Sequence, residues 1–350
     1  MKFLPVKIFV IILVLLLVLL FIISVGMGAM EIAPLQTLGI LAGQMGLDLF
    51  APFDAHQESV LLYIRLPRVL SAILIGASLA VSGASMQGLF RNPLADPGLI
   101  GISSGASLAA VFTIVAGTRL LPGVSSMANM YTLSIATFIG AFITMIIVYR
   151  LSNINGRVII STMLLAGIAI NAFAGALTGF FTFNANDAQL RSITFWTLGS
   201  LGGATWTNVI ALLPFTIIPI IVLPRLSKSL NALALGENTA MYLGINIDQA
   251  KRIIVVLTAL CVGASVAVAG IIGFVGLVIP HIVRKIVGPD HRYLLPLSAL
   301  SGALLLVAAD LLCRTAFAPS EVPIGIITAM VGAPLFLYIL IKERKTTRLA

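Results

Sequence analysis

Apolar stretches of membrane-spanning length follow one another along almost the whole chain, and they constrain its fold more than any other feature. A helix needs about 20 apolar residues to cross the hydrocarbon layer of a bilayer. The composition agrees, because 59% of the 350 residues are hydrophobic and only 9% are charged, whereas soluble domains have roughly 45 to 50% and 25%. The sequence therefore predicts an all-α integral membrane protein.

We predict ten membrane-spanning helices. The expected spans are 8–29, 66–90, 97–116, 130–150, 158–182, 206–224, 253–271, 272–287, 294–313 and 322–341. A cleaved signal peptide is the alternative for the first span. Its apolar run is longer than the roughly 7 to 15 residues of a signal core, and no small-x-small cleavage site follows, so we expect a retained helix.

The basic residues predict that both chain termini lie in the cytoplasm, because cytoplasmic loops of membrane proteins carry most of the Lys and Arg. With ten spans and a cytoplasmic N-terminus, 16 of the 21 Lys and Arg residues fall on the cytoplasmic side. The other five fall at or near the outer face, and these are Arg65, Arg68, Arg119, Arg191 and Arg314. Topology thus explains the net charge of +9 without a nucleic-acid partner.

A short pattern occurs twice in the chain. The pattern GASxAVxG occupies residues 76–83 and again residues 263–270, in the second and seventh spans. These two spans would run in opposite directions, as in transporters built from inverted repeats. Chance is the alternative, because small residues are common where membrane helices pack closely. We predict an inverted repeat that relates spans two to five to spans seven to ten.

Catalytic chemistry has little support in the sequence. No lysine follows a glycine, so a P-loop for nucleotide phosphates is absent. His56, His281 and His291 fit neither a catalytic triad nor a metal-ligand spacing. Cys261 and Cys313 lie in separate spans and suggest no disulfide or metal site. We therefore expect no enzyme activity, cofactor or metal in this polypeptide.

Asp310 is the acidic residue placed most clearly inside an apolar span, and it precedes Arg314 by one helical turn, so that the two side chains can meet. It either orients and neutralises Arg314 or takes part in transport. A chain with so few buried ionisable groups is a poor proton relay. Energy for uphill transport is therefore expected to come from a partner.

The cytoplasmic segment 226–249 is the expected contact for that partner. Gly236 and Gly244 each follow a short run that is compatible with a helix, and glycine often ends helices. We expect two short helices, near 227–235 and 237–243. A helix lying on lipid is the alternative, but basic residues are too sparse for a typical one. We interpret the segment as a protein-docking element.

Arg65 and Arg68 lie one turn apart at the outer end of the second span. Positive charge is disfavoured on this side of the membrane and at a helix N-terminus, so something must offset the penalty. The side chains either anchor the helix at lipid headgroups or dock a protein with complementary acidic residues. We favour docking.

Several ordered motifs resemble the FecCD-type permeases, which are the membrane subunits of ABC importers for iron-siderophore complexes, haem and cobalamin. The motifs are RLPR at 65–68, NPLADP at 92–97, LGE at 235–237, GFVGLVIPH at 273–281, PIG at 323–325 and GAP at 332–334. The resemblance implies one permease domain over residues 1–350, located in the cell membrane of a prokaryote. It also implies four partner subunits: a second permease (an identical copy or a paralogue), two cytoplasmic ATPases and an external substrate-binding protein.

The resemblance further implies ATP-driven import of an iron-siderophore-type chelate, with hydrolysis on the partner subunits. Arg65, Arg68 and Arg314 would dock the binding protein, with Asp310 as a supporting charge. The residues that couple the permease to the ATPase would be Gly236, Glu237, Ala240, Leu243 and Gly244. The alternative is a stand-alone secondary transporter with inverted repeats. The scarcity of buried ion-coupling residues and the long 226–249 segment both favour the importer.

Overall fold

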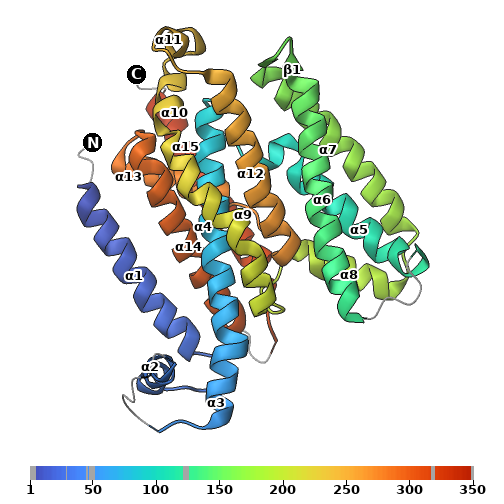
Figure 1. Ribbon diagram of the computed structural model, residues 1–350, viewed down its shortest axis with the longest axis vertical. Helices are drawn as coiled ribbons and strands as arrows, with labels where there is room; N and C mark the ends of the chain where they lie inside the picture. The colour runs from blue at the N-terminus through green and yellow to red at the C-terminus, as the bar shows by residue number, and fades with distance from the viewer. Residues whose placement is uncertain are drawn as a thin grey trace.

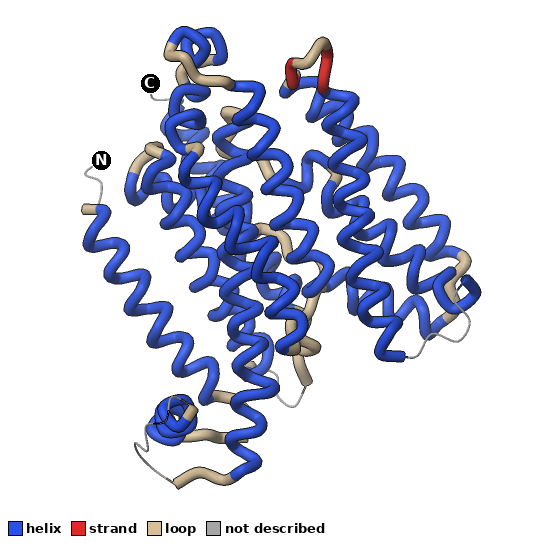
Figure 2. The backbone as a smooth tube through the Cα atoms, viewed as in Figure 1, coloured by secondary structure: helices blue, strands red, loops and turns tan. Residues whose placement is uncertain are grey.

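The computed structural model describes residues 5–28, 30–44, 46, 52–120, 126–316 and 320–347. It is an elongated bundle of helices that mostly run along its long axis (Figure 1), and helix dominates throughout (Figure 2). The long helices are α1 (Val6–Gly26), α4 (Leu66–Leu89), α5 (Ile102–Leu120), α6 (Ser126–Ser152), α7 (Ile160–Phe183), α9 (Trp206–Arg225), α12 (Ile247–Ala269), α13 (Val275–Val287), α14 (His291–Thr315) and α15 (Ile324–Thr347).

Shorter elements connect the long helices. They are α2 (Pro34–Gly43), α3 (Ala55–Val60), the π-helical turn η1 (Leu61–Arg65), the 3₁₀ turn η2 (Pro97–Ile100), α8 (Asp187–Leu198), α10 (Ser227–Ala234), α11 (Glu237–Tyr242) and the two-residue strands β1 (Asn153–Ile154) and β2 (Arg157–Val158). The strands pair in an antiparallel hairpin between α6 and α7. The hairpin, α10 and α11 lie at one end of the bundle, while α2 and α3 lie at the other (Figure 1).

The prediction of an all-α membrane fold is confirmed, and each expected span overlaps one long helix. Within the described residues, seven helices are long and apolar enough to cross a membrane, and the apolar helices Ile102–Gly117 and Ile324–Ile339 are shorter. With 13 residues, α13 is the shortest of the long helices. Length and composition alone therefore do not establish ten crossings, which stay a prediction.

Several boundaries differ from the sequence-based expectation, and at three of them local capping explains the difference. The third span was expected from residue 97, but Pro97–Ile100 forms a 3₁₀ turn and Gly101, at φ 83°, separates it from α5. Helix α12 begins at Ile247 because the side chain of Asn246 accepts a hydrogen bond from the Gln249 amide at 3.0 Å. The segment 226–249 therefore ends as part of α12. Between α12 and α13, Gly270 and Phe274 both have positive φ and interrupt the helix.

Helix α8 was not expected from the sequence. Its 12 residues include Asp187 and Arg191, so a search for apolar stretches of membrane length passes over it. A local signal for its start does exist: the Asn186 side chain accepts a hydrogen bond from the Gln189 amide at 2.9 Å, as in a capping box. A helix cap of this kind marks short helices that hydropathy misses.

Helix α4 lies at the centre of the bundle, between α9, α12, α13 and α14 (Figure 1). Its glycines allow close backbone contact with its neighbours. A methyl group at Gly76 would clash with the carbonyl of Gly302 on α14, and one at Gly302 would clash with the carbonyl of Gly76. Gly83 meets the backbone of Gly276 on α13 in the same way. Small residues at such contacts let membrane helices gain van der Waals packing, and they fix α4 against α13 and α14.

Candidate functional site

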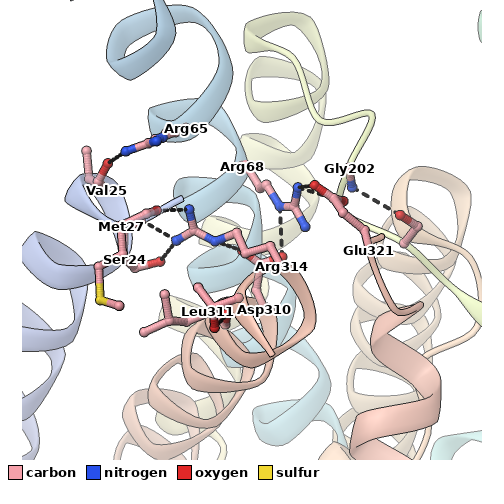
Figure 3. Close-up of polar contacts among 12 residues, drawn as sticks. Ser24, Val25, Met27, Arg65, Arg68, Gly202, Asp310, Leu311, Arg314 and Glu321 are labelled. Atoms are coloured by element: carbon pink, nitrogen blue, oxygen red, sulfur yellow. Dashed lines mark hydrogen bonds and ion pairs between the residues drawn. The ribbon is translucent and has the colours of Figure 1, made fainter. Parts of the chain in front are cut away.

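Three arginines gather at the end of the bundle where α2 and α3 lie (Figures 1 and 3). Arg65 ends the turn η1, Arg68 lies in the first turn of α4, and Arg314 lies in the last turn of α14. Their relative exposures are 5%, 8% and 8%. These side chains were expected to dock a partner protein, and the fold buries most of each one because each finds partners within the chain.

Arg68 binds two carboxylates (Figure 3). Its Nε donates to Oδ1 of Asp310 at 2.9 Å, and its Nη1 donates to both carboxylate oxygens of Glu321 at 2.9 and 3.0 Å. Asp310 is fully buried, whereas half of the Glu321 side chain is exposed. The expected contact of Asp310 with Arg314 is confirmed, with Oδ2 lying 3.5 Å from the Arg314 Nε. Asp310 therefore forms ion pairs with two arginines from different helices.

Arg65 and Arg314 bind the carbonyl groups at the end of α1 (Figure 3). Arg65 donates to the carbonyl of Val25 at 3.1 Å and also to those of Gly26 and Met30. Arg314 donates to the carbonyl of Met27 at 2.7 Å and to Ser24. The last carbonyls of a helix lack intrahelical donors and carry partial negative charge. They offset the cost of placing these two cations at this end of the bundle.

Glu321 is the member of this cluster that the sequence reasoning missed. It lies in the connection between α14 and α15, two residues before Pro323. Its ion pair with Arg68 can be seen only in the folded structure. A cavity of about 530 Å³ adjoins the cluster between the end of α1, the start of α2 and α14, and Arg314 is part of its lining. The cluster therefore has one exposed carboxylate and one arginine that faces a cavity.

The two expected short helices at the opposite end are confirmed as α10 and α11, each ending one residue before its expected end. Gly236 and Gly244 have φ values of 113° and 75°, a region that strains residues with a side chain. Ala240 is buried against the rest of the chain, but the apolar side chains of Leu235, Tyr242 and Leu243 are 68%, 92% and 61% exposed. These three residues form an apolar surface at the tip of the bundle.

Polar contacts hold α10 and α11 to the long helices. Asn231 on α10 donates to Asp290 Oδ1 at 2.7 Å and accepts from the His291 amide at 3.0 Å, at the start of α14. Although partial burial raises the pKa of Asp290, hydrogen bonds from the Arg292 amide and from Asn231 outweigh it and hold that pKa below its usual value. Glu237 on α11 pairs with Lys251 on α12 at 2.9 Å. Helix α14 thus connects α10 at one end with the arginine cluster at the other.

The described residues contain no group of three or more His, Cys, Asp and Glu side chains that is suited to a metal ion. The features they do contain are a buried arginine cluster at one end of a helical bundle and an apolar, helix-borne surface at the other. A bundle of long apolar helices with these features fits a transport permease of a membrane.

Comparisons with known proteins agree with this class. The chain matches the FecCD transport family over residues 16–342, and it belongs to that family. It is 47% identical over 285 residues to the hemin transport system permease protein HmuU of Yersinia pestis, covering 81% of this chain and 84% of that protein. It is 39% identical over 309 residues to the vitamin B12 import system permease protein BtuC of Shigella boydii, covering 88% and 91%.

A solved structure has the same fold. It is a metal-chelate type ABC transporter in an inward-facing conformation, which matches this chain with a TM-score of 0.82 and 32% sequence identity. The match covers 96% of this chain and 99% of the other. The chain is therefore a multi-pass membrane permease with the ABC-transporter permease fold.

Proposed function

We propose that this chain is the permease subunit of an ABC importer that brings a metal chelate into a prokaryotic cell across the cell membrane. The membership of the FecCD family carries the proposal. Its relatives are named as permeases for hemin and vitamin B12, and the similar structure is named as a metal-chelate type transporter. The proposed substrate is thus an iron or cobalt chelate, and the iron-siderophore complex expected from the sequence stays a prediction within this class.

The proposed topology has ten crossings with both termini in the cytoplasm. The start of α1 and the end of α15 lie toward the end of the bundle that holds α10 and α11 (Figure 1), which supports placing them on one side. Packing also supports the inverted repeat. Gly76 of α4 packs on α14, while the corresponding Gly263 of α12 lies against Ala141 of α6, at 3.2 Å for an added Cβ. Under the repeat, α14 and α6 are themselves equivalent.

The proposed contact for the two ATPase subunits is the tip formed by α10 and α11. Its exposed apolar side chains, among them Leu243, would be covered in the assembly, since exposed apolar patches often mark protein interfaces. Gly236 and Gly244 would provide the tight bends that set the angle of α11. The buried Ala240 would pack α11 against the bundle. Glu237 would hold α11 to α12 through its ion pair with Lys251. Movement of this tip would then couple ATP hydrolysis to transport.

The proposed contact for the external binding protein is the end of the bundle with Arg65, Arg68 and Arg314. Among the described residues, the three arginines face only two carboxylates, those of Asp310 and Glu321. The other acceptors of Arg65 and Arg314 include uncharged carbonyls of α1, so the cluster keeps a net positive charge. Asp310 supports the cluster by fixing both Arg68 and Arg314. Acidic residues on the binding protein would be attracted to this end, which steers the encounter and fixes its register.

The lateral surface of the bundle is proposed to meet lipid and a second permease subunit, identical or paralogous. Large apolar side chains such as Leu165, Phe173 and Phe183 on α7 are 67%, 63% and 88% exposed in the single chain. An aqueous environment would not tolerate such a continuous apolar surface. The membrane and the partner permease together provide the cover that it needs.

Transport by reconstituted vesicles tests the proposal against a stand-alone secondary transporter. The permease is reconstituted with its co-purifying ATPase and binding protein, and uptake of haem, cobalamin and an iron-siderophore complex is measured. We expect uptake that requires ATP and stops when the ATPase carries an inactivated nucleotide site. Uptake by the permease alone, driven by a proton or sodium gradient, would exclude the importer.

A further inference from the structure

A buried lysine connects two separate segments at the α10–α11 end of the bundle. Lys251 lies in the second turn of α12 and is only 2% exposed. Its Nζ lies 2.9 Å from Oε2 of Glu237 on α11. The same Nζ donates to the carbonyl of Val158, in strand β2, at 2.9 Å. Lys251 is therefore bonded to both α11 and the β1–β2 hairpin.

Both contacts matter to the free energy of the lysine. An ammonium group removed from water is strongly unfavourable unless it is paired and hydrogen-bonded. Here Glu237 supplies the countercharge and Val158 supplies a second acceptor. If α11 moved away without Lys251, or if the hairpin did, the buried charge would lose one of these partners. The arrangement therefore favours motions in which α11, the start of α12 and the hairpin stay together.

A cavity of about 1060 Å³ separates much of the hairpin from α11. Ile154 and Arg157 of the hairpin line it, as do Asn238 and Met241 of α11, with Lys251 among the lining residues. The amide of Val158 has a second contact with α12, to Oδ1 of Asp248 at 3.4 Å. The hairpin is therefore bonded to α12 through Lys251 and Asp248. Because a cavity lies between the hairpin and α11, the hairpin can move together with α12.

We propose that Lys251 is a positioning residue that makes the β1–β2 hairpin, and with it the start of α7, follow α11 when the ATPase subunits move α11. The inference rests on the proposed function and adds a mechanical link to it. Val158 lies two residues before the start of α7 at Ile160, so a displacement of the hairpin reaches a membrane-spanning helix directly. The tip of the bundle and α7 are then connected through one side chain.

The test uses the full complex of permease and ATPase in lipid nanodiscs, with spin labels at Ile154→Cys and Asn238→Cys. Cys261 and Cys313 are replaced by serine. Electron paramagnetic resonance gives the distance between the hairpin and α11 with and without a non-hydrolysable ATP analogue, and vesicles give the substrate imported per ATP hydrolysed. In the labelled parent we expect α11 and the hairpin to keep their separation when nucleotide binds.

In Lys251→Met we expect the separation to broaden and to change with nucleotide, and import per ATP to fall about tenfold, a typical coupling between sites. Lys251→Arg keeps the charge and the donors and should restore part of both. Lys7→Met is the matched control, because Lys7 is an exposed lysine on α1, outside the proposed ATPase contact. A Lys251→Met complex with parental separation and parental import per ATP would overturn the proposal.

Two further outcomes are distinguishable. If Lys251→Met does not assemble, Glu237→Gln removes the countercharge instead. If the distance between the two labels in Glu237→Gln still did not change when nucleotide binds, the proposed link would be overturned. If the unmodified permease neither binds the ATPase nor imports substrate with ATP, the proposed function fails and this inference falls with it. If the parent complex imports substrate and Lys251→Met has the same import per ATP and the same label separation, the proposed function stands and only the role of Lys251 is refuted.

Discussion

The carboxylate of Asp310 accepts a hydrogen bond from the Nε of Arg68 at 2.9 Å, although 242 residues separate them in the chain. The contact joins the last turns of α14 to the first turn of α4, the two helices that also touch through Gly76 and Gly302. A glycine contact midway along α4 and α14 and an ion pair near their ends therefore fix the same two helices. This pair of helices forms the frame that carries the arginine cluster.

Asp310→Asn should destabilise the permease. The change leaves Arg68 and Arg314 buried with less countercharge, and breaking a buried pair on one side costs about 3 to 5 kcal/mol. Thermal unfolding of the purified permease in detergent measures the effect. The control is Asp187→Asn, an exposed carboxylate on α8. Equal melting temperatures for the two variants would show that the Asp310 contacts contribute nothing to stability.

Glu321→Gln should strengthen docking of the external binding protein. Glu321 forms an ion pair with Arg68 in the free permease and is half exposed. A carboxylate of the binding protein must displace it before it can bind Arg68. A half-exposed ion pair is worth up to about 1 kcal/mol, which corresponds to an affinity gain of up to about fivefold. Titration of the binding protein onto the permease in nanodiscs measures this gain.

Glu31→Gln is the control for this titration, because Glu31 lines the cavity beside Arg314 but has no contact with Arg68 among the described ion pairs. Arg68→Glu should weaken the association strongly. If Glu321→Gln and Arg68→Glu both left the affinity unchanged, the arginine cluster would have no role in docking.

Gly76→Ala should reduce stability because the new methyl group meets the backbone of Gly302. Neither backbone can move without shifting a whole helix, so we expect at least the typical overpacking cost of about 1 to 3 kcal/mol. Gly175→Ala on α7 is the matched control, since an added Cβ there meets nothing within 4 Å. Yield and melting temperature of the two variants decide the matter, and similar values would contradict the close α4–α14 contact.

Leu243→Asp should weaken binding of the ATPase subunits by at least about tenfold, or 1.4 kcal/mol, because it places a charge in a surface that the ATPase is proposed to cover. The side chain is 61% exposed, so the fold itself should tolerate the change. Co-purification and titration with the ATPase provide the measurement. Tyr63→Asp changes a 69% exposed side chain at the other end of the bundle and should leave ATPase binding intact. Loss of binding in both variants would point to general damage.

Local sequence signals predicted much of the fold. Apolar runs marked each long helix, because a segment's hydropathy depends only on its own residues and the bilayer sets the length it needs. Gly236 and Gly244 marked the ends of α10 and α11, because their backbone angles suit glycine. The pairing of Asp310 with Arg314 followed from helical spacing alone. The break at Gly101 was missed, and the predicted break after residue 271 was placed a few residues from the observed one, because apolar residues continue through both.

The sequence by itself determined that this chain is a helical membrane protein of the FecCD type with basic residues at both ends. Only the tertiary structure decided that Arg65, Arg68 and Arg314 are buried and bonded within the chain. The partners that bury them, the end of α1 and Glu321, lie up to 290 residues away and leave no local signal. The same holds for Lys251, whose two partners come from segments that the fold alone brings together. Charge and hydropathy are properties of the sequence, whereas the neutralisation of a buried charge depends on which helices pack side by side.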